Sequence, residues 1–342
     1  MKYFFTGFIL LVASFATAQI VNITSPELKN ELVNYTAGAV VDTNGDGEIQ
    51  VTEALAVHRL YLQGGVSDDL TGLEAFTNLD TLTLYTWPMV LSHLNLSGWT
   101  WLRVLNCDSK NLQSVNLSGC FNLSNVTING YTPYPNVFIT SIDISNTPRL
   151  KDLLCDNLVV PELDLRQQDS LVNRASYWQS NIGVVNVSGL TMLQKITLTG
   201  HTGFINAESA TALKSISTAT GGSQDLQIVD SINVRGCTNL YDLSLGKEYS
   251  AASIDVSTNV NLRSFTGKSS TLATLDFSNC NRSMSIFGQF QNLRYLNLKN
   301  GHRDSVYINS TVNPSRQLYV CTDDFETRNI DSTLYVRGWS MN

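Results

Sequence analysis

A short apolar motif recurs along most of the chain at a nearly constant spacing, and this repeat constrains the fold more than any other feature. Typical copies are SVNLSGC (114–120) and TLDFSNC (274–280). Neighbouring copies are 21 or 22 residues apart, except for one gap of 27 and one of 47. Measured at the second apolar position, the copies lie at Leu96, Leu117, Ile144, Leu165, Val187, Val234, Val256, Phe277 and Leu298.

A second apolar series is nested between these copies. It has the pattern LxxLxL, as in the segments that run from Leu102 to Cys107 and from Leu240 to Leu245. Apolar residues two apart alternate as in a strand, and the segments are too short for helices. We therefore predict a mainly β solenoid over residues 57–305, with coils of 21–22 residues and parallel strands on both faces.

The two ends of the repeat differ from its middle. Leu70, Leu73 and Phe76 are three residues apart in the segment that closes the first coil, which is the spacing of a short 3₁₀ turn. We expect a helical return there and strand returns in later coils. Residues 19–56 are predicted to form a short helical N-terminal cap, and residues 306–342, where the spacing is lost, a C-terminal cap.

The chain begins with the features of a signal peptide. Lys2 precedes an apolar stretch, and Ala16 and Ala18 form a small-residue cleavage site, so residues 1–18 would be removed. The apolar run is too short to span a bilayer, and no later segment is long enough. We expect a secreted, extracellular protein without a transmembrane segment, and attachment at the cell surface stays open.

The charge of the protein excludes one class of partner. Lys and Arg number 22 and Asp and Glu number 29, giving a formal charge of −7. Nucleic acids and anionic membranes attract basic surfaces, so we expect neither as a partner.

The cysteines follow the repeat. Cys120, Cys237 and Cys280 share one repeat position, and Cys107 and Cys155 share another. The nearest members of each column are two coils apart, about 10 Å at strand spacing. Because a disulfide needs Cα atoms within about 7 Å, we expect buried, unpaired thiols.

Two segments carry a resemblance to a known family. DLTGLEAFTNLDTL resembles an internalin-type leucine-rich repeat, and the pattern LxxLxLSxCxxLxxLxC resembles the nested 10/11-residue repeats of secreted Bacteroidetes-type proteins. The resemblance covers residues 57 to about 321. It implies an extracellular protein that recognises or adheres to another protein and has no catalytic activity.

The predicted N-terminal cap contains a complete EF-hand calcium motif, DTNGDGEIQVTE at 42–53. The motif supplies the hard oxygen ligands that calcium prefers, with a glycine at its sharp turn. Because a lone loop joined to a rigid solenoid suits a cap, we expect structural calcium rather than a calcium sensor. A metal-free acidic turn is the alternative. The predicted ligands are Asp42, Asn44, Asp46, Glu48 through its carbonyl, Gln50 and Glu53.

A column of Asn and Asp faces outward between the apolar residues of the first motif. Two pairs on successive coils, Asp143 with Asp164 and Asp255 with Asp276, would stand about 4.8 Å apart, close to the carboxylate spacing of a retaining glycosidase. Catalysis needs two carboxyl groups with different pKa values, whereas a repeated column gives them similar surroundings. We expect a structural ladder and no enzyme, and a polysaccharide-cleaving β-helix enzyme stays the weakest alternative.

Aromatic residues gather in turns before residue 180. Aromatic side chains are enriched at binding hot spots, although they also serve as packing at the ends of coils. We predict a secreted, monomeric recognition or adhesion protein that binds an extracellular protein partner. A carbohydrate-binding module that holds a glycan is the main alternative. The candidate contact residues are Trp87, Trp99, Trp101, Tyr131, Tyr134 and Trp178.

Overall fold

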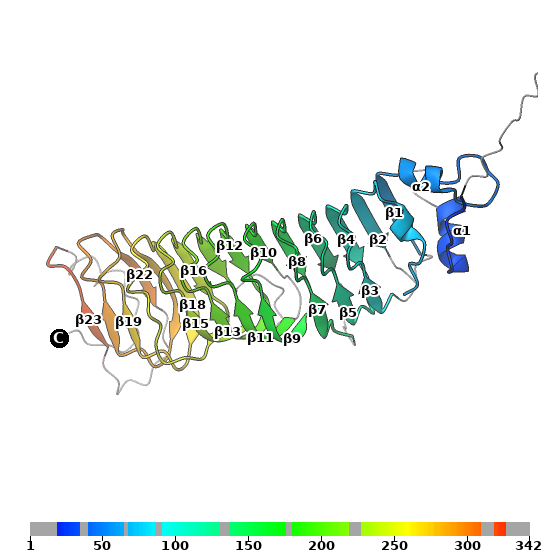
Figure 1. Cartoon of the computed structure of the whole chain (residues 1–342). Helices are drawn as coiled ribbons and strands as arrows, with labels where there is room; N and C mark the ends of the chain where they lie inside the picture. The colour runs from blue at the N-terminus through cyan, green and yellow to red at the C-terminus, as the bar shows by residue number, and fades with distance from the viewer. Residues whose placement is uncertain are drawn as a thin grey trace, which may run out of the picture.

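The computed structural model describes residues 19–34, 40–64, 68–85, 91–129, 137–175, 180–218, 227–308 and 318–325. Within them the chain winds as an elongated solenoid of parallel strands, with two helices at its N-terminal end (Figure 1). The predicted mainly β leucine-rich-repeat solenoid with strands on both faces is confirmed.

The first broad face is one uninterrupted sheet of 12 parallel strands. We refer to it as the continuous face. Its strands follow one another in chain order, one per coil: β1 (Arg59–Gln63), β2 (Thr81–Tyr85), β4 (Val104–Asp108), β6 (Asn125–Asn129), β8 (Asp152–Cys155), β10 (Asn173–Ala175), β12 (Lys195–Thr197), β14 (Ser215–Ser217), β16 (Asp242–Leu245), β18 (Ser264–Ser269), β20 (Ser285–Phe290) and β22 (Ser305–Ile308).

The opposite side, the return face, is divided into three sheets. The first contains β3 (His93–Asn95), β5 (Ser114–Asn116) and β7 (Ser141–Asp143). The second contains β9 (Val159–Asp164), β11 (Ser180–Asn186), β13 (Gly200–Asn206), β15 (Ile228–Asn233) and β17 (Glu248–Tyr249). The third contains β19 (Thr274–Asp276), β21 (Tyr295–Asn297) and β23 (Tyr319–Cys321).

The register explains the long gap in the repeat. Asn206 pairs with Asn186 on one side and with Asn233 on the other, so β13 belongs to a further copy of the motif. The gap of 47 residues thus holds two periods, and the inward residue of the extra copy is Ala207 instead of a larger aliphatic residue.

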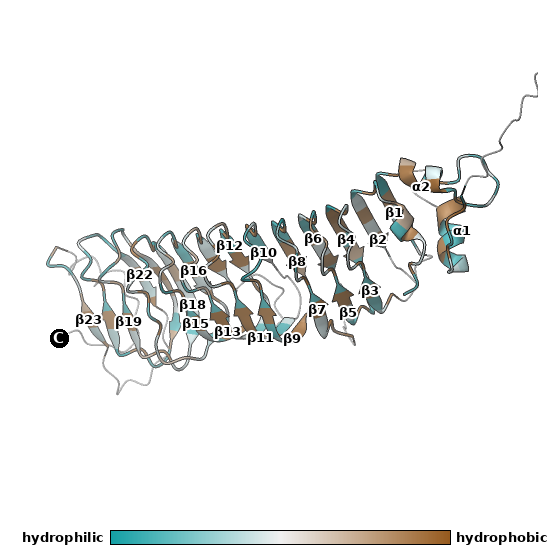
Figure 2. Ribbon diagram, viewed as in Figure 1, coloured by the Kyte–Doolittle hydropathy of each residue, from teal (hydrophilic) through white to brown (hydrophobic). Residues whose placement is uncertain are grey.

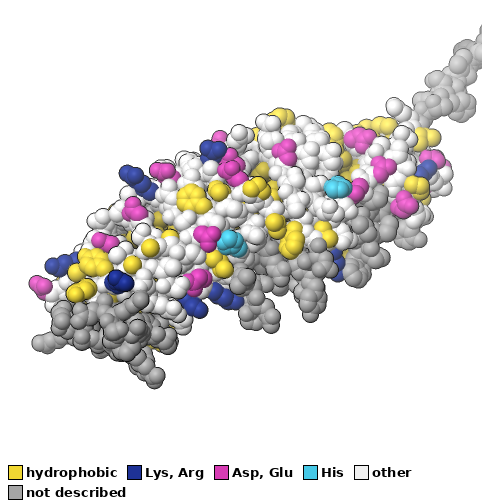
Figure 3. All heavy atoms as spheres, turned by 90° about the horizontal axis from the view of Figure 1, so that it is seen from below, with side chains coloured by type: hydrophobic (Ala, Val, Ile, Leu, Met, Phe, Trp, Pro, Cys, Tyr) yellow, Lys and Arg dark blue, Asp and Glu magenta, His cyan; other side chains and the backbone are white. Residues whose placement is uncertain are grey.

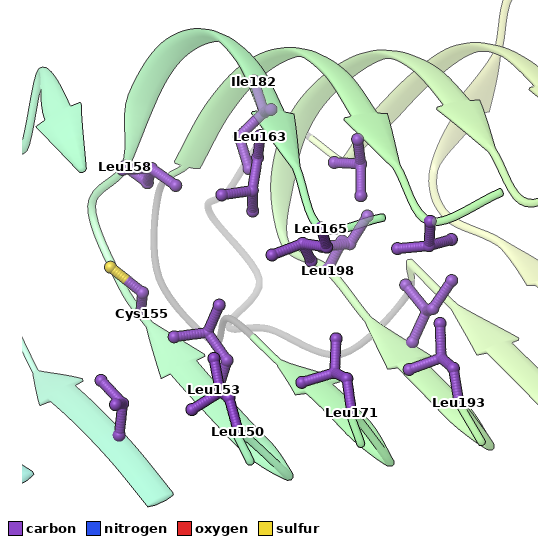
Figure 4. Close-up of a cluster of buried hydrophobic side chains, with 14 of the residues drawn as sticks. Leu150, Leu153, Cys155, Leu158, Leu163, Leu165, Leu171, Ile182, Leu193 and Leu198 are labelled. Atoms are coloured by element: carbon purple, nitrogen blue, oxygen red, sulfur yellow. The ribbon is translucent and has the colours of Figure 1, made fainter. Parts of the chain in front are cut away.

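The core lies between the two faces. The strands other than β10 contribute apolar residues (Figure 2), and Leu153 and Leu163, from opposite faces, point into the shared interior (Figure 4). The register stacks equivalent residues of successive coils, as in Leu82 beside Leu105. One position breaks this order, because the fully buried Arg174 stands between Leu153 and Ile196 in the same column.

The N-terminal cap covers the open end of the core. Helix α1 (Pro26–Asn34) buries Leu28 and Leu32, and the Glu31 carboxylate accepts a hydrogen bond of 2.7 Å from the Gln63 N–H at the end of β1. Helix α2 (Val51–Ala56) leads into the first coil, whose return leg contains the 3₁₀ turn η1 (Leu73–Ala75). The predicted helical return of the first coil is therefore confirmed.

Strand pairing continues past residue 305, where the predicted C-terminal cap begins. Strand β22 pairs with β20 over residues 305–308, and β23 pairs with β21, so the solenoid continues to Cys321. Cys321 occupies the position that holds Asn or Asp in other copies, and this difference hid the last repeat. Residues 305–308 and 319–321 therefore belong to the sheets of the solenoid.

Candidate functional site

The side chains of the predicted calcium loop are held by the loop's own backbone. The N–H groups of Gly45 and Gly47 donate to the two carboxylate oxygens of Asp42, at 2.7 and 2.9 Å. Asn44 and Asp46 each accept an N–H two residues further along, at 2.8 Å. Both glycines have positive φ, 72° and 79°, which allows the sharp reversal of the chain.

Glu53, the last predicted ligand, closes the loop. Its Oε1 accepts from both the N–H and the hydroxyl of Thr43, and its Oε2 accepts from the Gln50 N–H at the start of α2. Burial opposes ionisation of Glu53, but the hydrogen bonds from Gln50 and Thr43 outweigh it, so the pKa lies below its usual value. Glu53 is therefore held as a carboxylate.

Of the other predicted ligands, Asn44, Asp46 and Gln50 lie close together, whereas the Glu48 side chain does not join them. Asn44 Nδ2 lies 2.9 Å from Asp46 Oδ2 and 3.0 Å from Gln50 Oε1, while Glu48 pairs with Lys29 at 2.6 Å. These oxygen donors fit calcium chemically. However, no three His, Cys, Asp or Glu side chains form a metal-holding cluster within the described ranges. Calcium binding stays a prediction.

The Asn/Asp column shapes turns. In all ten coils that carry it, Oδ1 accepts the N–H of the residue two positions later, at 2.9 to 3.4 Å. The expected ladder bonds between coils occur at 3.3 and 3.4 Å among three neighbouring members. The members are Asn95, Asn116, Asp143, Asp164, Asn186, Asn206, Asn233, Asp255, Asp276 and Asn297.

One carboxylate of each candidate pair, Asp164 and Asp255, is favoured in its ionised form. The Arg166 side chain holds the pKa of Asp164 below its usual value, and hydrogen bonds from Ser257 do the same for Asp255. A general acid in such an enzyme needs a raised pKa. The geometry therefore assigns these carboxylates to the turns.

The aromatic candidates separate into two groups. Trp99 is 7% exposed and stacks on the partly buried Trp101 with ring centroids 5.9 Å apart. Both rings pack against the core, so Trp99 has little surface left for a partner. The other candidates, Trp87, Tyr131, Tyr134 and Trp178, lie outside the described residues.

In the sequence, these four residues all follow strands of the continuous face. Trp87 lies between β2 and β3, Tyr131 and Tyr134 between β6 and β7, and Trp178 between β10 and β11. Each connection leaves the continuous face, and the strands of that face are parallel, so all three start at the same long edge of the solenoid. The connection that carries Trp99 and Trp101 leads back to the continuous face.

Two surface clefts of about 320 Å³ each were not predicted from the sequence. One lies on the continuous face and is lined by Asn125, Asp152, Asn173 and Lys195, among others. The second lies on the return face between β7 and β9 and includes Asp143, Glu162, Asp164 and Gln168. Neither set of residues forms a contiguous motif, so only the stacking of coils reveals them.

The cysteines are unpaired, as predicted for the two repeat columns. All five column members are buried, and burial raises the pKa of Cys107 and Cys155 to about 12. The Cys120 and Cys237 thiols donate to carbonyls of the preceding coil at 3.0 and 2.9 Å. The five column thiols therefore fill space in the core and form no disulfides.

Comparison of the sequence with models of known protein families and with curated proteins gives no match. Among solved structures, an internalin of Listeria monocytogenes is similar at 15% identity, covering 88% of this chain and 99% of that one, with a TM-score of 0.40. A leucine-rich repeat protein of Leptospira interrogans has 13% identity, covers 85% and 91% of the two chains, and has a TM-score of 0.34. A leucine-rich repeat protein of Bacteroides ovatus has 9% identity, coverage of 81% and 87%, and a TM-score of 0.27. In the described part of this chain, no helix has the length and apolar character needed to cross a membrane.

Proposed function

We propose that the protein is a secreted, non-catalytic recognition or adhesion module that binds a protein partner. The observation that carries this proposal is the common edge of the continuous face, from which the aromatic-bearing connections start. Aromatic side chains on connections held by a rigid scaffold are a usual source of binding energy.

The surface supports a protein partner more than a polyanion. On the long side of the molecule seen in Figure 3, acidic and basic side chains are scattered and form no basic patch. Such a surface favours contacts made by hydrogen bonds and aromatic side chains.

The test is a binding assay with a partner captured from the native environment and then purified. We expect Trp87→Ala, Tyr134→Ala and Trp178→Ala each to weaken binding by about tenfold or more. Phe121→Ala, an exposed residue on the connection that leads from β5 back to the continuous face, is the control. Trp99→Ala is unsuitable, because removal of a buried tryptophan destabilises the fold by about 3 to 5 kcal/mol. Unchanged affinity in all three edge variants would contradict the proposal.

A glycan is the second candidate, and one observation favours it. Phe287 and Tyr307 stack on the outer side of the continuous face with centroids 5.0 Å apart, although they are 56% and 43% exposed. An exposed aromatic pair of this kind suits an amphipathic ligand. Binding on a glycan array that is lost in Phe287→Ala and kept in Trp87→Ala would support this candidate.

We also propose that the loop at residues 42–53 binds calcium as a structural part of the cap. The oxygen-rich side chains, both positive-φ glycines and the ionised Glu53 support it. Calcium should raise the unfolding temperature, and Glu53→Gln should abolish that increase while Glu27→Gln, outside the loop, retains it. If millimolar EGTA changes neither the unfolding temperature nor a calorimetric calcium titration, the loop does not bind calcium.

Export is proposed from the N-terminal motif, which lies outside the described residues. N-terminal sequencing of the protein from culture medium should give a chain that starts at Gln19. Sedimentation equilibrium should give the mass of a monomer.

A further inference from the structure

The backbone ladder of the return face is interrupted between β7 and β9. In intact coils, the residue after each Asn or Asp donates its N–H to the carbonyl of the next column member, as Leu117 does to Asp143 at 2.7 Å. Among the described residues no such bond joins Ile144 to Asp164. The two strands belong to different sheets and are joined at their start by the Ile139–Leu158 bridge.

Pro161 removes one backbone donor at this interruption. It lies three residues before Asp164, and the equivalent Gln113 and Thr140 each donate a backbone N–H to the preceding coil, at 2.7 and 2.9 Å. Proline has no N–H to donate. The Thr140 carbonyl therefore lacks the partner that this position supplies elsewhere, and the strands separate beyond the bridge.

The opening exposes part of the edge of β7. In a parallel strand, the N–H and C=O of successive residues point alternately to the two neighbours. The Asp143 carbonyl points back to Leu117, so Ile142 directs its N–H and C=O toward the opening. An unpaired edge of this kind is a template for an added strand.

The walls of the cleft give it an acidic character. The side chains of Asp143, Glu162 and Asp164 line it, together with the apolar Ile142 and Leu163. Arg166 pairs with Asp164 at 2.7 Å, which leaves the Asp143 and Glu162 carboxylates without a basic side chain within ion-pair distance among the described residues. The cleft therefore favours a cationic group beside an apolar one.

A buried acceptor marks the inner wall. Gln168, which also lines the cleft, is 2% exposed and donates from Nε2 to the Ile144 carbonyl at 3.1 Å. Its Oε1 is buried and has no hydrogen-bond partner. A buried acceptor without a partner is destabilising, and a donor from a bound ligand would relieve it.

We propose that this cleft binds an extended segment of the protein partner, and this inference rests on the proposed protein-binding function. The segment adds to the open edge of β7 and places a Lys or Arg side chain against Asp143 and Glu162. This is strand addition at a free sheet edge, with one basic side chain giving specificity. The acidic walls and the missing donor both favour a peptide that supplies N–H groups and a positive charge.

The test begins with a library of displayed peptides of about ten residues, selected on the full chain. We expect selected peptides to contain Lys or Arg between β-branched residues. In calorimetry with one synthetic peptide, the double variant Asp143→Asn with Glu162→Gln should weaken binding by about tenfold or more. Asp255→Asn with Asp276→Asn is the matched control, since it changes the same column on distant coils and should alter Kd less than twofold.

Two further measurements separate strand addition from simple charge attraction. A peptide with N-methyl groups on alternate backbone nitrogens should lose binding, because it cannot donate to the edge of β7. Gln168→Met should weaken binding with little change in the free energy of unfolding, because the Thr147 hydroxyl still donates to the Ile144 carbonyl at 2.7 Å.

The outcomes distinguish this site from the general function. If no peptide is selected, or if affinity survives both the cleft variants and N-methylation, the cleft proposal is overturned. A natural partner that still depends on Trp87 or Trp178 would in that case leave the proposed protein-binding function intact. A third outcome is that peptide binding depends on the cleft while the variants at Trp87, Tyr134 and Trp178 keep full affinity for the partner. That outcome would support the cleft as the binding site and overturn the common edge as the binding site.

Discussion

The continuous face and the return face are built from the same coils, yet one is a single sheet and the other is three. Strands such as β2 and β4 have five residues and bury two side chains each, whereas β3 and β5 have three residues and bury one. A strand that buries two side chains has its pairing register fixed at two positions. In these N-terminal coils the return face has fewer inward side chains, whereas its middle sheet contains the seven-residue strands β11 and β13.

The breaks in the return face are bridged by side chains. At β7 and β9, Gln168 donates to the Ile144 carbonyl, and in the coil after β17, Asn259 donates to the Val234 carbonyl at 2.9 Å. Cys120 makes the equivalent bond to Leu96 with its thiol. A side-chain donor at this position thus reaches the preceding coil at both breaks and also, as at Cys120, beside an intact ladder.

The largest difference between the faces should appear when inward residues are truncated. Leu153→Ala, in the middle of the continuous face, should lower the free energy of unfolding by about 3 kcal/mol, because it leaves a cavity in a packed column. Ile142→Ala, half-buried beside the opening, should cost only about 1 kcal/mol. Urea denaturation of both variants checks this, and equal losses would show that the faces contribute alike.

A smaller effect should come from filling a close backbone approach on the return face. A Cβ at position 183 would lie 2.3 Å from the Pro161 carbonyl oxygen. Gly183→Ala should therefore force β9 and β11 apart and cost about 2 kcal/mol. Asn181→Ala, an exposed change on the same strand, is the control in thermal unfolding. A neutral Gly183→Ala would mean that β9 shifts freely toward the opening.

Alkaline pH should destabilise both faces through their buried thiols. Burial raises the pKa of Cys107 and Cys155 on the continuous face, and of Cys280 beside the return face, from 9.0 to about 12. Since the folded state holds the proton more tightly, this stability is complete below pH 9 and is lost as pH rises toward 12. Each thiol should contribute on the order of 1 to 2 kcal/mol between pH 9 and 11.

The measurement for the thiols is a set of urea denaturation curves at several alkaline pH values. Cys107→Ala should show a shallower loss of stability than the unaltered protein, and Cys321→Ala, a partly exposed position near the end of the solenoid, is the comparison. Identical slopes for the unaltered protein and Cys107→Ala would refute this assignment.

The smallest expected effect, and the most direct test of the break, is Pro161→Ala. The new N–H can donate to the Thr140 carbonyl, but the unfolded chain also gains freedom, so the free energy of unfolding should change by less than about 1 kcal/mol. Hydrogen exchange should show a newly protected amide at position 161 and slower exchange at Ile142. If both amides exchange quickly, proline is not the cause of the opening.

Much of the fold follows directly from the repeat. The inward residues of both series, the 3₁₀ return at Leu73 and the burial of five cysteines were all predicted correctly. Copies with altered residues at key positions were missed, as at Ala207, at Arg174 and at Cys321. Arg174 occupies a leucine position, where burial lowers its pKa and nearby Asp156 opposes that change.

The candidate sites show the same division. The ligands of the calcium loop and the turn-forming Asn/Asp column are contiguous or periodic, so their residue types and spacing were enough to identify them. The cleft between β7 and β9 is lined by Asp143 from one coil and by Glu162 and Gln168 from the next, so these residues meet only when coils stack. Local chemistry and periodicity can be read from the sequence, because each coil repeats the same pattern of residue types. Which hydrogen bonds form between coils was decided in three dimensions, because a ladder bond needs a donor from one coil and an acceptor from the next.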